Sequence, residues 1–524
     1  MRLEENKVIY DQEDFMAGFI SKPYSSFQVQ KGQGAAYMQN FDPFTTPDTV
    51  GTACPGAGVA TITNVSGTVR PASPILDMIM NATGTFGYGI GGTSVHRFEE
   101  PSTLTNSAAA GFPHIMALSA AHINHATLAG KSVALYRSAN GSRVFYGWSD
   151  NTDWDVGIYN PADKSFNDDF MSTVPATPLG TTATDLTGGA SKNIVLYKDW
   201  GDDYLYIGAG NLLHAYDGSA NKFYSQQLDL PKDYEIVSIV ENGYDLVVFA
   251  NTTTVGNAGT KKGKATAFFW GSDRPTTYYK VVDLDDNYVS AAFPFKGSMG
   301  CFTGQRGSSP TYALRLFNGN TFEPVAFYDF GGLPVNGGVD IIDDCIYWNA
   351  NGQVSFYGQQ KGKFPSALFQ PMSGSGSNAG FLKALSGNTI YLSSGIGSTG
   401  GFEYESSLAT ASYFRSTTWY PTLPFGKQMR LKGVQVKFAN TCTNQSALKL
   451  ELMTNGASTT TIVFTGVDDV VSTDMIRRYS ADSSGNPFPS FNDISIKLTW
   501  SGGGDDAPMV ERVELFYALI DFNN

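Results

Sequence analysis

The sequence predicts an all-β protein: an irregular β-propeller of six or seven blades with an extended N-terminal arm and a C-terminal β-sandwich. Its composition, with 57 glycines, 27 tyrosines, 35 phenylalanines and only 16% charged residues, is typical of β proteins that are dense in turns. A pattern of apolar strand, aromatic residue and tight turn recurs through the middle of the chain, which indicates a radial repeat. Residues 409–524 instead alternate apolar and polar side chains, which indicates sheets with one solvated face.

The repeated hairpin is clearest in LLHAYDGSANKFYSQQ, residues 212–227. Asp217-Gly218 readily supplies the positive φ that a short turn requires, and a second strand begins a few residues later. Together with Tyr216, four other aromatic residues precede such a turn, at steps of 40 to 57 residues: Tyr159, Trp270, Phe317 and Tyr357. Because no other copy has a histidine at the position of His214, we interpret the stretch as scaffold.

A short strand with apolar residues at consecutive positions accompanies the hairpins, and we expect such a strand to be buried on both faces. Seven segments have this pattern, near Tyr88, Tyr146, Tyr206, Val247, Cys301, Tyr347 and Tyr391. Together with the hairpins they predict four-stranded antiparallel blades within residues 71–408. The first and last copies are the weakest, so that six and seven blades both fit the sequence.

The two ends of the chain do not repeat. Residues 1–70 are rich in Gly, Pro and aromatic residues without a helical period, and they predict an extended arm with short strands. Such an arm has little core of its own, so we expect it to lie against the main body or a neighbouring subunit. Residues 409–524 predict a sandwich domain, with alternating segments at 431–438, 447–453, 459–464, 494–500 and 510–517. The boundary before it is expected between Tyr404 and Thr422.

Charge and hydropathy exclude several classes of protein. A net charge of −13 opposes binding to nucleic-acid phosphates, which needs clustered Lys and Arg. No apolar run reaches the roughly 18 residues of a membrane helix. The start, MRLEENKVIYDQEDF, has no apolar signal core, so we expect synthesis and folding in the cytoplasm. The four dispersed cysteines are expected to be buried free thiols: Cys54, Cys301, Cys345 and Cys442.

The sequence predicts no catalytic residue, no cofactor and no metal ligand. His122 and His125 lie among predicted strands, where positions i and i+3 point to opposite faces and do not share a metal. Asp-rich runs at 150–155, 202–203, 283–286 and 343–344 lie beside strands, where Asp commonly bonds turn backbone. SDNTDWD, residues 149–155, comes closest to a calcium loop but lacks its glycine and distal glutamate.

The layout of the chain resembles a family of virion proteins. AAYMQNFDPFTTPDTV (residues 35–50) lies in the arm, and FRSTTWYPTLPFGKQMRLKGVQVKF (residues 414–438) leads from the predicted propeller into the sandwich. In this order of segments the chain resembles tail nozzle proteins of short-tailed bacteriophages, the group that includes tail tubular protein B. The resemblance covers nearly all of the chain and rests on the order of its segments and on their composition.

The resemblance implies a non-enzymatic structural protein of the virion tail, assembled in the host cytoplasm as a ring, usually of six subunits. It also implies contacts with an adaptor, fibre or spike protein and a central passage for the viral DNA, without specific binding. An acidic chain fits such a passage, because repulsion keeps the polyanion from adhering to the wall.

The alternative function is a carbohydrate-binding or glycosidase-type propeller used in host-surface recognition. Aromatic residues that stack on sugar rings would be its signature, and the candidates are Trp148, Trp154, Trp270 and Trp419, although aromatic residues at such positions more often belong to the blade core. Two carboxylates about 5 to 10 Å apart in the propeller mouth would favour the enzyme.

Overall fold

The computed structural model of the chain is almost entirely β, with several antiparallel sheets and few helical residues. It describes residues 8–12, 14–19, 33–39, 41–42, 54–55, 57–61, 76–80, 86–91, 94–99, 114–117, 129–138, 141–149, 154–162, 165–174, 176–177, 193–198, 204–252, 263–271, 273–304, 311–328, 332–342, 345–349, 353–358, 366–371, 380–385, 389–394, 401–408, 412–416, 426–438, 448–454, 457–463, 476–501 and 510–521. None of the helices among these residues has the length and apolar character needed to cross a membrane.

The chain divides into two compact units. The central unit comprises Thr61–Gln353 and Met372–Tyr404, and the terminal unit comprises Met1–Ala60, Val354–Pro371 and Glu405–Asn524. The terminal unit therefore contains both ends of the chain. The predicted division into an arm (1–70), a propeller (71–408) and a sandwich (409–524) remains a prediction.

Seven sheets of four or five strands follow one another along the middle of the described chain, and most pair their strands in chain order. The first contains β7 (Asp77–Met80), β8 (Phe86–Gly91), β9 (Ser94–Glu99) and β10 (His114–Ala117). The second contains β11 (Ala129–Ser138), β12 (Gly141–Ser149), β13 (Trp154–Asn160) and β14 (Ser165–Asn167), and α1 (Phe170–Thr173) follows it. The third contains β16 (Ile194–Lys198), β17 (Tyr204–Ala209), β18 (Leu212–Asp217) and β19 (Lys222–Asp229), with β15 (Ala176–Thr177) parallel to β19.

The fourth, fifth and sixth sheets also pair their strands in chain order, and the seventh ends with a strand from earlier in the chain. The fourth contains β20 (Tyr234–Asn242), β21 (Asp245–Thr252), β22 (Ala265–Trp270) and β23 (Lys280–Asp283), and the fifth β24 (Tyr288–Phe295), β25 (Ser298–Gly304), β26 (Tyr312–Phe317) and β27 (Phe322–Tyr328). The sixth, after the 3₁₀ helix η3 (Asn336–Gly338), contains β28 (Val339–Ile342), β29 (Cys345–Asn349), β30 (Gln353–Gly358) and β31 (Ser366–Pro371). The seventh contains β32 (Leu382–Leu385), β33 (Thr389–Ser394), β34 (Gly401–Leu408) and β6 (Ala57–Thr61).

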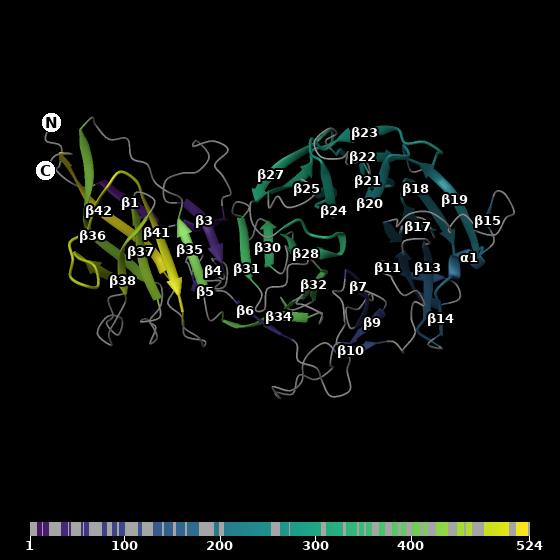
Figure 1. The fold of residues 1–524 in the computed structure, drawn as a ribbon, viewed down its shortest axis with the longest axis horizontal. Helices are drawn as coiled ribbons and strands as arrows, with labels where there is room; N and C mark the ends of the chain where they lie inside the picture. The colour runs from purple at the N-terminus through teal and green to yellow at the C-terminus, as the bar shows by residue number, and fades with distance from the viewer. Residues whose placement is uncertain are drawn as a thin grey trace. The chain divides into compact units, whose positions relative to one another are not determined.

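Within the central unit, the first strand of each sheet contacts the first strand of the next. These contacts join β7 to β11, β11 to β16, β16 to β20, β20 to β24, β24 to β28 and β28 to β32. Figure 1 shows the first five sheets, all of which belong to this unit, following one another in chain order around a common centre. Apolar clusters fill the space between neighbouring sheets: Phe145, Trp154 and Ile207 pack between the second and third, and Leu213, Val248 and Trp270 between the third and fourth.

The strand predictions for this region are confirmed. All seven apolar segments are strands, and each is the second strand of its sheet: β8, β12, β17, β21, β25, β29 and β33. β17, β21 and β25 are buried at nearly every position, as expected for strands covered on both faces. The hairpin predicted at residues 212–227 is also present, since Tyr216 in β18 pairs with Phe223 in β19.

The terminal unit contains two larger sheets that share one core. One has the order β1 (Val8–Gln12), β42 (Val510–Asp521), β36 (Lys427–Phe438) and β39 (Ile476–Tyr479), with β40 (Ser490–Phe491) also on β36. The other has the order β2 (Asp14–Phe19), β3 (Gln33–Gln39), β35 (Ser412–Ser416), β41 (Ile494–Trp500), β37 (Leu448–Thr454) and β38 (Ala457–Val463), and β4 (Phe41–Asp42) pairs separately with β5 (Cys54–Pro55). Val434 and Leu515 of the first sheet belong to the same buried cluster as Leu450 and Leu498 of the second.

The alternating segments of residues 409–524 are strands as predicted, and β37 alternates buried with less buried positions. The N-terminal strands enter the same sheets. β1 pairs along β42, with Tyr10 opposite Leu515, and β3 pairs with β35, with Met38 opposite Phe414. Residues at the beginning of the chain therefore complete sheets built by its end.

Candidate functional site

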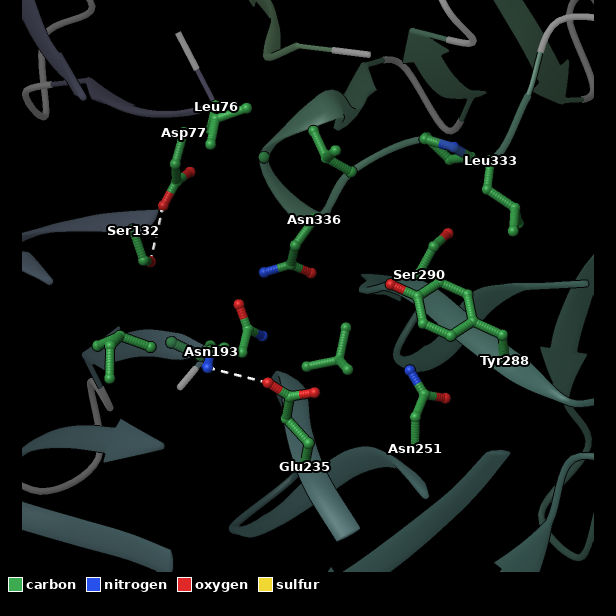
Figure 2. Close-up of a pocket in the computed structure, with 16 residues that line it drawn as sticks. Leu76, Asp77, Ser132, Asn193, Glu235, Asn251, Tyr288, Ser290, Leu333 and Asn336 are labelled. Atoms are coloured by element: carbon green, nitrogen blue, oxygen red, sulfur yellow. Dashed lines mark hydrogen bonds between the residues drawn. The ribbon is translucent and has the colours of Figure 1, made fainter. Parts of the chain in front are cut away.

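A polar cavity of about 370 Å³ lies in the central unit, near the beginning of several first strands (Figure 2). Its polar lining residues are Asp77, Ser132, Asn193, Glu235, Asn251, Tyr288, Ser290 and Asn336. They come from the first five sheets and from η3. Concave sites of this volume with a few polar groups are the usual places for small ligands.

Asp77, at the start of β7, connects the first sheet to the second. Its Oδ2 accepts hydrogen bonds from the Ser132 hydroxyl (2.8 Å) and the Val133 amide (2.9 Å) on β11. Ser132 in turn accepts from the Leu196 amide on β16 (3.2 Å), so one hydroxyl joins three sheets. Burial raises the pKa of Asp77 above its ordinary value, against the lowering effect of these hydrogen bonds and of Lys383.

Two further polar side chains connect the third, fourth and fifth sheets. The backbone N–H of Asn193 donates to Glu235 Oε1 (2.9 Å). The side-chain Nδ2 of Asn193 donates to the Ile236 carbonyl (2.9 Å). Asn251 Nδ2 donates to the Val289 carbonyl (2.8 Å), and Asn251 Oδ1 accepts from the Val289 amide (2.7 Å). Each side chain therefore satisfies backbone groups of the neighbouring sheet.

The 3₁₀ helix η3 forms another part of the cavity wall. Asn336 Oδ1 accepts a hydrogen bond from the Ser238 hydroxyl of β20 (2.7 Å). At Gly337 an added Cβ would lie 2.4 Å from the Leu76 carbonyl oxygen and 2.7 Å from Asp77 Cα. Only glycine fits this approach between η3 and the start of β7.

The polar groups of the cavity are mostly committed to bonds between sheets. Asp77 accepts hydrogen bonds from three donors, counting the Met78 amide, and both ends of the Asn251 amide are used. Ser290 is the exception, since its buried hydroxyl has no hydrogen-bond partner within the described part of the chain. No histidine or cysteine is among the cavity's described lining residues. The arrangement braces the sheets against one another.

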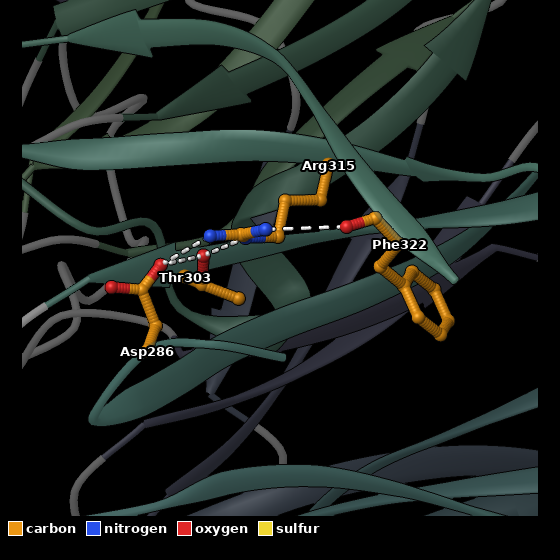
Figure 3. A network of polar contacts seen from close by, with 4 residues as sticks. All are labelled: Asp286, Thr303, Arg315 and Phe322. Atoms are coloured by element: carbon orange, nitrogen blue, oxygen red, sulfur yellow. Dashed lines mark hydrogen bonds and ion pairs between the residues drawn. The ribbon is translucent and has the colours of Figure 1, made fainter. Parts of the chain in front are cut away.

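A second buried network lies within the fifth sheet (Figure 3). The Arg315 guanidinium on β26 donates to Asp286 Oδ2 (3.1 Å), Thr303 Oγ1 (2.9 Å) and the Phe322 carbonyl (3.2 Å). Thr303 also donates to Asp286 (2.6 Å). Arg315 is only 7% exposed, so its charge depends on this carboxylate.

A third network holds α1 against β13. The buried Asp155 carboxylate accepts from the Val156 amide (2.6 Å), the Ser172 amide (3.2 Å) and the Ser172 hydroxyl. Burial raises the pKa of Asp155 to about 7. Nearby, the hydroxyl of Tyr146 donates to Asp168 (2.8 Å) and the indole of Trp148 donates to the Asp168 carbonyl (2.8 Å).

None of the described residues that the sequence singled out as site candidates lines the cavity. Trp148, Trp154 and Trp270 are at most 2% exposed, so these three are core residues and are not available to stack on sugars. Asp286 binds Arg315 and Asp283 binds Lys264 (2.8 Å), both at or beside the ends of strands. His122, His125, Asp202, Asp203, Asp343, Asp344, Trp419 and Cys442 lie outside the described residues, as do positions 150–153.

The cysteine prediction is confirmed where the structure tests it. Cys301 and Cys345 are buried free thiols, and burial raises the pKa of Cys301. Sequence reasoning missed the cavity residues Asp77, Asn193 and Glu235. Each directly precedes the apolar part of a first strand, and this position is the signal that could have identified them.

Within the described ranges, no group of three or more His, Cys, Asp and Glu side chains is arranged to hold a metal ion. Comparison of the chain with models of known protein families and with curated proteins found no match to either.

Proposed function

We propose that this chain is a non-enzymatic structural protein of a bacteriophage tail, a nozzle or tail-tip component that assembles as a ring and forms part of the DNA ejection channel. Six copies are the favoured ring. Its partners would be other tail proteins, namely an adaptor and a fibre or spike, and the viral DNA would pass through the lumen without specific binding. The virion tail is then its location, after assembly in the host cytoplasm.

The fold proposed with this function is a propeller of seven blades joined to a β-sandwich. Successive contacts between β7, β11, β16, β20, β24, β28 and β32 support the radial arrangement, because these are the strands nearest the axis of a propeller. The seventh sheet takes its fourth strand, β6, from the N-terminal part of the chain, as expected where a propeller is closed by its own ends. The buried cluster shared by the sheets of the terminal unit supports the sandwich.

The observation that carries the proposal is the use of the cavity's polar groups as braces. Asp77, Ser132, Asn193 and Asn251 bond each sheet to the next, where an enzyme or receptor would leave such groups free for a substrate. Sheets that are joined by buried hydrogen bonds suit a subunit that must keep its shape when mechanical force acts on it. The net charge of −13 suits a wall past which DNA moves.

Electron microscopy and analytical ultracentrifugation of the purified chain test this proposal. The chain should form closed rings, alone or after co-expression with the products of neighbouring genes. It should not retain DNA in a filter-binding assay at physiological salt, because the acidic surface repels phosphates. A chain that stays monomeric under both conditions would contradict the proposal.

A carbohydrate-active propeller is the second candidate, favoured by the presence of the two carboxylates Asp77 and Glu235 in one cavity. Glycosidases use such a pair as acid and nucleophile or base. The assay is release of reducing ends from bacterial polysaccharides. Activity that is lost in both Asp77→Asn and Glu235→Gln would replace the structural proposal with this one, whereas no release by the wild-type chain would remove it.

A further inference from the structure

Two tyrosines are unusually exposed on the central unit. Tyr244 and Tyr279 are 84% and 59% exposed, and they are the aromatic members of the small set of large hydrophobic side chains that the described residues expose. Neighbouring aromatic residues are buried, for example Trp270 at 0% and Phe268 at 2%. Because the fold buries its other large rings here, these two call for an explanation outside the core.

Tyr244 lies at the tip of the hairpin between β20 and β21, where Asn242 pairs with Asp245. The first turn residue, Gly243, has φ of +68°, and Tyr244 is not among the residues with positive φ. This is the pattern of a type II′ turn, which requires the glycine but places no demand on the second residue. Neither the turn nor the core therefore requires an aromatic residue at position 244.

Polar contacts join the hairpin tip to the loop after β22. The Tyr279 hydroxyl donates to Asp245 Oδ2 (2.7 Å). Arg274 Nη1 donates to the carbonyls of Tyr244 (3.1 Å) and Gly271 (3.0 Å), while its Nε donates to the Tyr206 hydroxyl (2.9 Å). Both segments are thus fixed before any ligand arrives, which lowers the entropy cost of binding.

The side chains around the rings favour a small hydroxylated ligand over a protein. A protein interface needs roughly 800 Å² per partner with few charges at its centre. Here the Asp245 carboxylate directly follows Tyr244 and accepts from Tyr279, and Asp273 and Asp283 are exposed nearby in sequence. A sugar ring needs only an aromatic face for its C–H groups and an acceptor for its hydroxyls, and both are present.

We propose that Tyr244, Tyr279 and Asp245 form a binding site for a neutral pyranose unit of a polysaccharide. The ring of Tyr244 stacks on the sugar face, and the Asp245 carboxylate, oriented by Tyr279, accepts from sugar hydroxyls. Uronic and sialic acids are disfavoured, because Asp245 and the net charge of −13 repel a sugar carboxylate. The inference stands apart from the tail proposal and does not depend on ring formation.

The test uses the full chain on an array of neutral and acidic oligosaccharides from bacterial surface polysaccharides, followed by calorimetric titration of the strongest neutral binder. Tyr244→Ala should weaken this binding about tenfold, the loss of one stacked ring. Tyr244→Phe should retain it. Leu519→Ala, which truncates a side chain that is 46% exposed in the terminal unit, is the matched control and should bind as the wild type does.

The absence of binding to every neutral oligosaccharide would overturn the inference, as would equal affinity of wild type and Tyr244→Ala. A third contrary result is a change in ring or oligomer formation on Tyr244→Ala without any glycan binding, since it would assign the tyrosines to a contact between subunits. Circular dichroism of each variant establishes that the fold is retained. Failure of the chain to form rings would leave this result unaffected.

Discussion

The side-chain amide of Asn251 hydrogen-bonds both backbone groups of Val289, with Nδ2 donating to the carbonyl at 2.8 Å and Oδ1 accepting from the amide at 2.7 Å. Asn251 lies on β21 and Val289 on β24, so the pair joins the fourth sheet to the fifth in the way that a strand pairing would. Both residues are buried. Since β24 is the edge strand of its sheet among the described residues, this side chain satisfies backbone groups that would otherwise be buried without partners.

Asn251→Ala should therefore destabilise the protein by about 3 kcal/mol, because it leaves a buried N–H and a buried C=O of Val289 unsatisfied. Urea denaturation followed by fluorescence measures the loss. Asn320→Ala is the control, since Asn320 is exposed in the turn between β26 and β27, and its substitution should change the stability by less than about 0.5 kcal/mol. Equal stability of the two variants would show that the braces do not stabilise the sheets.

Gly337→Ala should be destabilising by about 2 kcal/mol, because the new methyl group would meet the Leu76 carbonyl and Asp77 Cα and push η3 away from β7. Gly433→Ala provides the comparison. Its added Cβ would meet the Tyr479 carbonyl oxygen at 3.4 Å, an ordinary contact, so that variant should be nearly as stable as the wild type. The thermal unfolding midpoints of the two variants and the wild type test this difference in stability. A Gly337→Ala midpoint equal to that of the wild type would contradict the close approach between η3 and the start of β7.

The repeated strands could be predicted from sequence because their signal is local. β17 and β21 are apolar at consecutive positions since sheets cover both of their faces, and Tyr216 marks the hairpin because a ring fills the space between sheets. The pairing of Tyr10 with Leu515 could not be predicted, because two edges some 500 residues apart carry no shared local pattern. Asn251 was missed for the same reason, because it is an ordinary strand-end asparagine until Val289 is placed beside it.

The ion pairs of Asp286 with Arg315 and of Asp283 with Lys264 predict that these two aspartates contribute unequally to stability. Asp286→Ala leaves the Arg315 charge buried without a carboxylate, and we expect a loss of about 2 kcal/mol, below the value for fully buried pairs because Asp286 is 25% exposed. Asp283→Ala breaks an ion pair with Lys264 in which both side chains are about half exposed, so its cost should stay under about 1 kcal/mol. Urea denaturation of both variants tests the order, and a larger loss at Asp283 would contradict it.

Asp155 predicts a specific dependence of stability on pH. Burial raises its pKa to about 7 from 3.8, and the neighbouring Asp169 charge acts in the same direction, against the hydrogen bonds from Ser172 and Val156. Between pH 3.8 and about pH 7, Asp155 is protonated in the folded chain and ionised in the unfolded chain. The contribution of Asp155 to stability is therefore greatest below about pH 4, falls as the pH rises toward 7, and is constant above that.

Asp155→Asn removes the titration but keeps an oxygen acceptor for Ser172, so the stability of the variant relative to the wild type should increase as the pH rises from 4 to 7. Asp217→Asn is the matched control with the opposite sign. Although partial burial alone would raise the pKa of Asp217, hydrogen bonds from Ser219 and Ala220 lower it, so replacing Asp217 should cost stability as its carboxylate ionises. Urea denaturation of the three proteins at several pH values measures both differences. A difference between Asp155→Asn and wild type that does not change with pH would show that Asp155 titrates as an ordinary carboxyl group.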